Sequence, residues 1–344
     1  MKGALANVFW QLKYSFYIII MDIIDFENEN DYASQAGSGA LLNPRVDSTF
    51  KALFTQPTEE SRAALKSFLE AATEKPIKSV SLTSNDAVVE FSGQRNVSYD
   101  VACIFNDGLS AEIEMQAFNQ KYDYGKRAEY QVARLETTYL RKGESWLKAP
   151  TVYQISVLNF GYKPWQRKND ENYKATTVSR YAMRTKDGRE LSNSLNIVFV
   201  ELPNAAALEK SLESNTLLEN WAVFLRDADN PKKVDIIKKL TMKEEGIMQA
   251  QKSLSSISSS RELWLAQYRQ EIFERDRISS MEAAQKEGLE MGYERGIEKG
   301  IEKGIEKGIE KNKIETALSA LKLGLSIEQI SKITGLPRSE IEKL

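Results

Sequence analysis

Two short apolar runs, VSYDVACIF and LSAEIEMQ, flank Asn106-Asp107-Gly108. Runs rich in β-branched and apolar residues on both sides of such a turn predict a β-hairpin. A three-residue loop with Gly108 in the left-handed conformation pairs Phe105 with Leu109. The length of this loop decides which side chains share a face of the hairpin, because side chains alternate with period two.

In the three-residue register Asp100 stands directly opposite Glu114, and Gln116 lies on the same face. A two-residue loop would put the two acids on opposite faces. Two facing carboxylates in a largely apolar hairpin repel each other and resist desolvation. A divalent cation between them relieves both costs, and Mg²⁺ favours such oxygen ligands.

Helical and strand patterns alternate through the first 205 residues. Amphipathic runs predict helices, and short β-branched runs predict strands. We expect helices at 47–54, 59–72 and 121–142, strands at 77–82, 151–160 and 195–202, and a loop or edge strand at 86–93.

The helix expected at 121–142 carries Arg127, Arg134 and Arg141 at intervals of seven residues. That spacing stacks the three arginines along one stripe. The stripe is either a solvated face or a phosphate-facing surface beside the hairpin, and the sequence leaves both interpretations open.

Basic and aromatic residues are interleaved at 163–189. Eight basic side chains in this segment outnumber three acidic ones. Such a mixture suits neutralisation of a nucleic-acid backbone and stacking on bases, with Lys163, Arg167 and Lys168 as the leading candidates. The alternative is a solvated loop anchored by its aromatic residues.

From residue 204 onward the pattern becomes helical. Trp221, Phe224 and Leu225 recur at helical spacing and are expected in a core. The break at 229–231 predicts a helix end, and a further helix is expected at 232–240. The polar stretch near Ser253 predicts a loop within the helical region.

Residues 296–311 are four copies of Gly-Ile-Glu-Lys. Each copy advances a helix so that the isoleucines spiral by roughly 40°. Each glycine costs about 1 kcal/mol relative to alanine, so a marginal, bendable helix is predicted. Residues 313–344 then resemble a helix-turn-helix, with Ser326 and Gln329 as a capping box. Glu340 and Glu342 on the short last helix favour packing or self-association over groove recognition.

The N-terminal 40 residues differ from the rest. An apolar run at 8–24 is interrupted by Gln11 and Lys13 and is too short to span a membrane comfortably. It lacks a small-residue cleavage site. Residues 27–40 read as a disordered polar tail. We interpret the segment as an added or mis-started N-terminus, with Met21 as the alternative start and no stable membrane association.

The amino-acid composition limits the catalytic mechanisms and metal sites that this chain can have. The chain of 344 residues has no histidine and one cysteine, Cys103. Every mechanism with a histidine base or ligand is therefore excluded, as are disulfides within the chain and Cys-rich zinc sites. A single cysteine suits the cytoplasm. The formal net charge of −2 excludes a globally basic nucleic-acid binder, so contacts with phosphates must come from local patches.

The ordered segments resemble the Rpn family of recombination-promoting nucleases, also described as PD-(D/E)XK-type transposases, within the PD-(D/E)XK superfamily. The resemblance covers about residues 41–344. The matching segments are LLNPRVDSTFKALF around Asp47, YDV at Asp100, EMQ at Glu114, RAEYQVARL from Arg127, TVYQISVLNF from Thr151 and VFVELP near Glu201. Most of the superfamily has Lys where this chain has Gln116, but Gln is usual in the Rpn group.

This resemblance implies an α/β fold with a restriction-endonuclease-like mixed-sheet core flanked by helices and followed by a helical C-terminal region. It implies metal-dependent DNA endonuclease activity associated with recombination or transposition. Asp100, Glu114 and the Met115 carbonyl would hold Mg²⁺ or Mn²⁺. Gln116 cannot act as a base but would orient the attacking water. Asp47 is either an accessory acid of the metal site or the N-cap of its helix.

Two other functions stay open at this stage. One is a catalytically weak DNA-binding module in recombination, and the other is an oligomerising scaffold that acts through its C-terminal helices. The expected organisation is an N-terminal extension at 1–40, a nuclease-like core at 41–205, a helical region at 206–290, a repeat spacer helix at 291–312 and a small helical unit at 313–344.

Overall fold

The computed structural model describes residues 28–85, 98–106, 108–118, 122–139, 143–167 and 169–344. The 86–93 segment, Arg141 and Lys168 lie outside these residues. Two compact units make up the chain, Met1–Glu271 and Ile272–Leu344. Helix α8 (Arg261–Lys322) begins in the first unit and continues in the second.

A six-stranded mixed sheet forms the centre of the first unit, in the order β1-β2-β3-β4-β6-β5. Strands β3, β4 and β6 are parallel, and the outer pairs are antiparallel. The strands are β1 (Val80–Leu82), β2 (Val101–Phe105), β3 (Leu109–Gln116), β4 (Val152–Leu158), β5 (Val178–Ala182) and β6 (Leu195–Glu201). The predicted strands 151–160 and 195–202 are confirmed, β1 is shorter than expected, and edge strand β5 was not predicted.

The β2–β3 hairpin has the predicted three-residue connection, and Phe105 pairs with Leu109. Gly108 has the expected positive φ, at 131°, and Asn106 also has a positive φ, at 47°. The Asn106 side chain donates a hydrogen bond to Pro76 O (2.6 Å) and accepts one from Lys78 N (2.8 Å). These bonds hold the turn against the segment leading into β1, which fixes the loop length and therefore the register.

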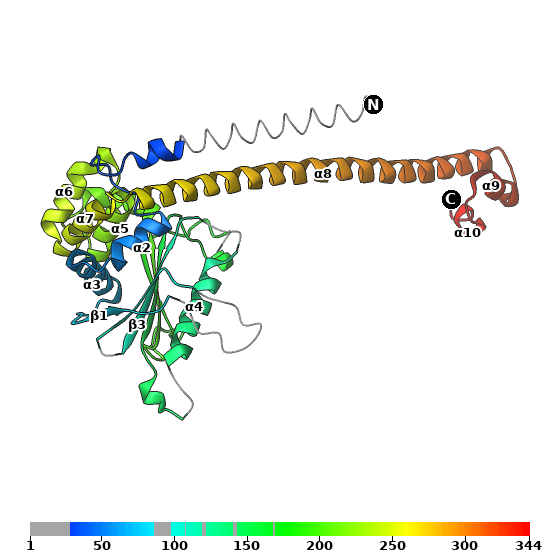
Figure 1. The fold of residues 1–344 in the computed structure, drawn as a ribbon. Helices are drawn as coiled ribbons and strands as arrows, with labels where there is room; N and C mark the ends of the chain where they lie inside the picture. The colour runs from blue at the N-terminus through cyan, green and yellow to red at the C-terminus, as the bar shows by residue number, and fades with distance from the viewer. Residues whose placement is uncertain (1–27, 86–97, 107, 119–121, 140–142, 168) are drawn as a thin grey trace, which may run out of the picture. The chain divides into compact units, whose positions relative to one another are not determined.

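The two faces of the sheet are covered by different helices. Helix α4 (Tyr124–Tyr139) lies along one face (Figure 1). Buried residues from several helices form a continuous core with the other face, which includes Trp221 as predicted. These helices are α2 (Asp47–Thr55), α3 (Glu59–Thr73), α5 (Leu217–Asp227), α6 (Val234–Lys243) and α7 (Glu245–Ile257).

Short 3-10 turns join several of these elements, at η1 (Trp146–Lys148), η2 (Trp165–Arg167), η3 (Leu202–Lys210) and η4 (Pro231–Lys233). The last of them coincides with the predicted break after α5. None of the described helices is both long and apolar enough to cross a membrane.

The loop predicted near Ser253 is only partly right, because residues 253–257 complete helix α7 and residues 258–260 form the turn that leads into α8. Leu254 and Ile257 are buried on one face of this helix. Ser253 is also buried, and its hydroxyl donates a hydrogen bond to Leu53 O (2.9 Å). Serines therefore fit the helix because their hydroxyls bond to backbone carbonyls in place of water.

Residues 28–40 differ from the disordered tail that was expected. Residues 28–33 are helical. The ring of Tyr32 packs against Trp264, with centroids 5.7 Å apart, and against Tyr268, at 5.1 Å. Its hydroxyl donates to Glu271 Oε1 (2.9 Å) and accepts from Gln267 Nε2 (2.8 Å). Glu29 also forms an ion pair with Arg269, and Ala33 is buried, so several contacts together hold this stretch in place.

In the second unit, α8 passes through the Gly-Ile-Glu-Lys array without a break. Helices α9 (Ile327–Thr334) and α10 (Arg338–Ile341) follow, and the predicted Ser326–Gln329 capping box opens α9. A small apolar cluster joins the three helices through Ala317, Ala320, Ile330, Leu336 and Ile341. Helix α10 is too short to present a recognition face, so these helices pack mainly on one another.

Candidate active site

The carboxylates predicted to face each other lie at the open end of the β2–β3 hairpin. Val101 pairs with Ile113, so the next position sets Asp100 opposite Glu114. Asp100 Oδ2 accepts a hydrogen bond from Met115 N (2.8 Å). Burial, followed by the negative charge of Asp47, raises the pKa of Asp100 to about 8. The Met115 N–H opposes this rise but does not cancel it.

Asp47 is not the N-cap of its helix, which corrects one of the two interpretations of this residue. Val46 precedes the helix in an extended conformation and makes no side-chain cap, and Asp47 is the first residue of α2. Its carboxylate instead raises the pKa of Asp100 both by its charge and by a hydrogen bond between the two side chains. Three acids therefore gather at this end of the hairpin: Asp47, Asp100 and Glu114.

Glu114 is buried and is bound by side chains from helix α4. Arg127 forms an ion pair with Oε1. Gln131 donates to Oε2 (2.6 Å), and the hydroxyl of Tyr124 donates to the same oxygen at 3.4 Å. Burial raises the pKa of Glu114 above its ordinary value, although the charge of Arg127 and these hydrogen bonds lower it part of the way back.

Gln116 follows Glu114 on the same face and shares its arginine. Arg127 Nη1 donates to Gln116 Oε1 (3.0 Å) and also to the hydroxyl of Tyr122 (2.8 Å). The amide nitrogen of Gln116 donates to Phe118 O at 3.4 Å. One guanidinium therefore connects the two polar side chains of the EMQ segment.

A buried polar layer beneath these residues was missed in the sequence. Strand β4 pairs Gln154 with Glu112 and Ser156 with Glu114. Gln154 Nε2 donates to Ser156 Oγ (2.6 Å), which also accepts from Tyr124 (3.0 Å). The signal was present, since Gln154 and Ser156 alternate within an otherwise apolar strand and Glu112 precedes Glu114 by one period of two.

Glu112 is completely buried, and neither of its carboxyl oxygens has a hydrogen-bond partner among the described residues. Burial, followed by the charge of Glu114, raises its pKa well above the ordinary value. An uncharged Glu112 would avoid the cost of a buried carboxylate. The residue thus adds a further oxygen-bearing side chain under the site.

Arg127 and Arg134, the two arginines of the stripe that the structure describes, are turned toward the sheet, so the solvated-face interpretation is wrong for these two. Arg127 is half-buried against Glu114. Arg134 is only 7 % exposed. Buried apolar neighbours on the same helix, Ala128, Val132 and Leu135, explain the orientation, because they turn this side of α4 onto β4 and β6.

The basic segment is anchored close to the start of α4. The hydroxyl of Tyr162 donates to Asp123 Oδ1 (3.1 Å), and its ring packs against Phe199 at a centroid distance of 5.0 Å. Lys163 lies 5.7 Å from the centroid of the Tyr173 ring and donates to Asp170 O (2.7 Å). Arg167 is exposed and 3.9 Å from the carboxylate of Asp170. The aromatic residues thus anchor the segment, and the tip of Arg167 stays accessible.

The donor set fits a hard divalent cation. Among the described residues, no group of three or more acidic or cysteine side chains is already arranged as a metal site. The cationic guanidinium of Arg127 instead forms an ion pair with the carboxylate of Glu114. Burial and the neighbouring negative charges raise the pKa values of Asp100 and Glu114. A bound cation would stabilise the charged form of both carboxylates, and carboxylate oxygens are the ligands that such a cation prefers.

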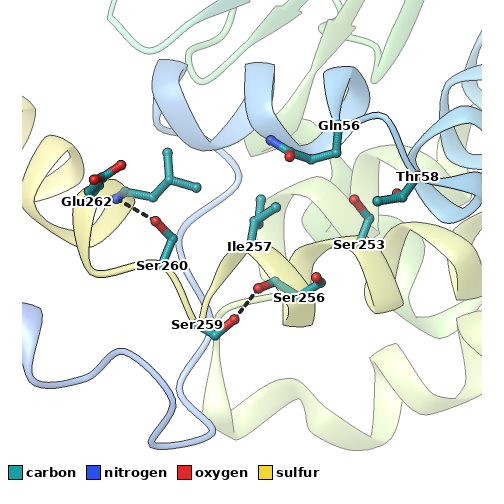
Figure 2. A pocket seen from close by; sticks show the side chains of 9 residues that line it. Gln56, Thr58, Ser253, Ser256, Ile257, Ser259, Ser260 and Glu262 are labelled. Carbon is teal, nitrogen blue, oxygen red and sulfur yellow. Dashed lines mark hydrogen bonds between the residues drawn. The ribbon is translucent and has the colours of Figure 1, made fainter.

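A separate cavity of about 460 Å³ lies between the α2–α3 junction and the α7–α8 junction. Gln56 and Thr58 line one side, and Ser253, Ser256 and Ser260 line the other (Figure 2). Among the lining residues that the structure describes, Glu262 is the only ionisable one. The described part of its lining includes no residue of the acidic cluster and no convergent groups for acid–base chemistry.

The antiparallel β2–β3 hairpin leads into parallel strands, Asp100 and Glu114 lie at its open end, and helix α4 packs over them. This arrangement is that of a restriction-endonuclease-like fold. The model of the PD-(D/E)XK nuclease family transposases matches residues 44–284. The chain belongs to this family, which confirms the resemblance and supports a nuclease- or transposase-like role. A comparison with functionally curated proteins gives no match, and neither does a comparison with solved structures.

Proposed function

We propose that this protein is a divalent-metal-dependent DNA endonuclease that hydrolyses phosphodiester bonds in recombination or transposition. The observation that carries the proposal is the position of Asp100, partly buried just before β2, opposite the buried Glu114 of β3. Holding such groups together costs free energy in the folded protein. Acidic groups with such perturbed pKa values are concentrated at functional sites, for example where they bind a cation.

Asp100 and Glu114 would hold Mg²⁺ or Mn²⁺ through their carboxylate oxygens, with the Met115 carbonyl as a further ligand. Such a cation, when bound, activates water and stabilises negative charge on a phosphate. Asp47 adds negative charge behind Asp100 and strengthens the attraction for the cation. The absence of histidine from the whole chain removes the most common general base.

The remaining side chains of the site position the reactants. Gln116 has no titratable group, so it orients the attacking water by hydrogen bonding. For this its amide must exchange its present partners, Arg127 and the Phe118 carbonyl, for the water. Arg127, once it leaves Glu114, presents a planar guanidinium that suits two oxygens of a phosphate.

The DNA backbone would lie across the start of α4 and the basic segment. Lys163 and Arg167 are in this segment, and Tyr162 ties it to Asp123 immediately before α4. Lys168 is assigned to the same contact from the sequence. Trp165, an exposed aromatic residue in the same turn, offers a surface for stacking.

Cleavage of supercoiled plasmid with Mg²⁺ or with EDTA tests the proposal. Asp100→Asn and Glu114→Gln should each reduce the rate at least 100-fold without loss of folding. Glu201→Gln is the matched control, because Glu201 is another buried carboxyl group on the same sheet. Gln116→Ala should slow cleavage rather than abolish it. Equal activity of wild type, Asp100→Asn and Glu114→Gln would refute the assigned site.

A further inference from the structure

Three side chains of α4 reach the carboxylate of Glu114 from one face of the helix. Tyr124, Arg127 and Gln131 are three and then four residues apart, a spacing that aligns side chains along a single stripe. They divide the two carboxylate oxygens between them. Arg127 pairs with Oε1, whereas Gln131 and Tyr124 both donate to Oε2. One oxygen is therefore bound to a cationic side chain and the other to uncharged donors.

The partners of the two oxygens differ in how freely they can move away. The Arg127 side chain is 32 % exposed, so it can leave Oε1 for solvent or a phosphate. Gln131 is only 2 % exposed, and its bond to Oε2 is 2.6 Å long. Tyr124 is also buried, and its hydroxyl proton is shared between Oε2 at 3.4 Å and Ser156 Oγ at 3.0 Å. Oε1 is thus the exchangeable oxygen and Oε2 is the fixed one.

The contribution of Gln131 to the fold does not explain why a glutamine stands at this position. Only the nitrogen of its amide can donate, so Nε2 must face the carboxylate. The amide oxygen is then buried, and it has no partner among the described residues. Because a buried acceptor without a partner is unfavourable, an apolar side chain of the same length would fill this space at least as well. What the glutamine adds is its bond to Glu114.

Divalent cations differ in how they bind a carboxylate. Mg²⁺ requires nearly ideal octahedral geometry at short distances. The two oxygens of one carboxylate are too close together to occupy adjacent corners of an octahedron. Ca²⁺ is larger, accepts six to eight oxygens and often takes both from one carboxylate. A carboxylate with one oxygen held elsewhere therefore suits Mg²⁺ or Mn²⁺ and denies Ca²⁺ a further ligand.

We propose that Gln131 determines the metal selectivity of the site, because it holds Oε2 of Glu114 and leaves only Oε1 for the cation. Mg²⁺ and Mn²⁺ are thereby favoured over Ca²⁺. Tyr124 contributes to a smaller extent, since its bond to Oε2 is longer and shared with Ser156. Both are positioning residues that act through Glu114. The inference deepens the proposed function and rests on it, because it concerns the cation that Asp100 and Glu114 would hold.

The other acid of the pair is restrained by the backbone. Oδ2 of Asp100 accepts a hydrogen bond from Met115 N (2.8 Å). A backbone donor is not removed by exchanging its side chain, whereas the restraint on Glu114 comes from a side chain. Selectivity can therefore be altered at Glu114 by one substitution in α4, without a change to either acid.

Competition between metal ions tests the inference in the full-length chain without DNA. Mn²⁺ binding is measured by electron paramagnetic resonance, and Mg²⁺ or Ca²⁺ is then added to displace it. The ratio of the Mg²⁺ and Ca²⁺ dissociation constants reports selectivity independently of cleavage. Gln131→Met removes the donor but keeps the length of the side chain. Gln154→Met is the matched control, because Gln154 is a buried glutamine of the same polar layer that donates to Ser156 (2.6 Å).

Gln131→Met should shift the ratio about 10-fold in favour of Ca²⁺, since Oε2 becomes a further ligand that Ca²⁺ can use and Mg²⁺ cannot. Tyr124→Phe keeps the ring and should shift the ratio in the same direction by a smaller factor. It also provides the answer if Gln131→Met fails to fold. Gln154→Met should stay within about two-fold of wild type. Circular dichroism and urea unfolding show which variants are folded.

The possible failures can be told apart. An unchanged ratio in the folded Gln131→Met or Tyr124→Phe chain, with Mn²⁺ still bound, would overturn the inference and leave the proposed metal site intact. An equal loss of affinity for all three ions would show that Gln131 supports the site without selecting the ion. An equally large shift in Gln154→Met would assign the effect to the whole polar layer. Mn²⁺ binding by Asp100→Asn as tight as by wild type, or none by wild type, would refute the proposed site and this inference together.

Discussion

Arg127 forms an ion pair with the carboxylate of Glu114. The arginine comes from α4 and the acid from β3, and both are held where the helix packs on the sheet. The same guanidinium donates to Gln116. In this state the positive charge that the acidic site requires is supplied by a side chain of the chain itself. A metal ion that binds Glu114 must compete with it.

Replacing Arg127 with Gln should therefore change metal binding and cleavage in opposite directions. The affinity for Mn²⁺, measured by electron paramagnetic resonance without DNA, should rise several-fold because a competing cation has been removed. Plasmid cleavage should fall about 100-fold, since the guanidinium is then missing from the phosphate. Lys126→Gln is the control of equal charge on an exposed position of α4, and it should leave both values within two-fold. Weaker Mn²⁺ binding by Arg127→Gln would show that the arginine supports the metal site instead.

The stability of the first unit should depend on the protonation of Glu201. This residue is buried at the end of β6, where Oε2 accepts from Tyr162 N (2.8 Å) and Asn204 Nδ2 (3.0 Å). Oε1 has no partner among the described residues. Burial raises its pKa from 4.5 to about 7, against the effect of the two hydrogen bonds.

A raised pKa means that the folded state holds the proton more tightly than the unfolded state. Below pH 4.5 both states are protonated and the group has no effect. As the pH rises to about 7 the unfolded state loses its proton first, so the folded state becomes less stable. Glu201→Gln should thus gain stability relative to wild type between pH 4.5 and 7, by about 3 kcal/mol, and the difference should then level off. Urea unfolding of both proteins at several pH values measures it. A difference that does not change with pH would reject the assignment.

The hairpin and its acidic face could be predicted from the sequence because both depend on local rules. A turn of known length and side-chain alternation fixed the pairing of Phe105 with Leu109, and from there the position of Asp100 relative to Glu114. No comparable rule connects β3 with α4. The contact between Arg127 and Glu114 depends on how the helix is rotated on the sheet, which the spacing of the arginines alone leaves undetermined.

Two other errors have the same origin. Ser253 looks like a loop residue by composition, but a carbonyl of α2, that of Leu53, accepts its hydroxyl. The polar tail before residue 40 has almost no apolar pattern, yet the ring of Tyr32 packs against Trp264, which lies more than 200 positions away in the chain. In both cases the partner that stabilises the element lies far away in the chain, and sequence periodicity reports only on neighbours.

The basic segment should contribute to DNA affinity through phosphates. Replacing Lys163, Arg167 and Lys168 with Gln together should weaken binding by about 10-fold at moderate salt, because fewer counterions are released on binding. The slope of log affinity against log salt should become shallower by up to about 3. A triple replacement of Lys232, Lys233 and Lys238, basic residues of the η4–α6 region, is the matched control. An unchanged slope for the first variant would show that its side chains are only solvated.

Shortening the chain should separate the contribution of residues 28–40 to stability from that of the residues before them. A chain that begins at Met21 keeps Tyr32 and its contacts with Trp264, Gln267 and Glu271. It should melt at the same temperature as the full chain. A chain that begins at Leu41 loses the ring and both hydrogen bonds of its hydroxyl, and it should be less stable by about 2 kcal/mol, or roughly 5 °C.

Two point variants assign this loss to the tyrosine. Tyr32→Ala in the full chain should reproduce most of the destabilisation. Tyr32→Phe keeps the ring but leaves Gln267 and Glu271 without their hydroxyl partner, so it should cost about 1 kcal/mol. Differential scanning calorimetry of the five proteins (the full chain, the two shortened chains and the two point variants) gives the comparison. If the Leu41 start were as stable as the full chain, the packing of residues 28–40 would contribute nothing to the fold, and the interpretation of this segment as a dispensable extension would hold after all.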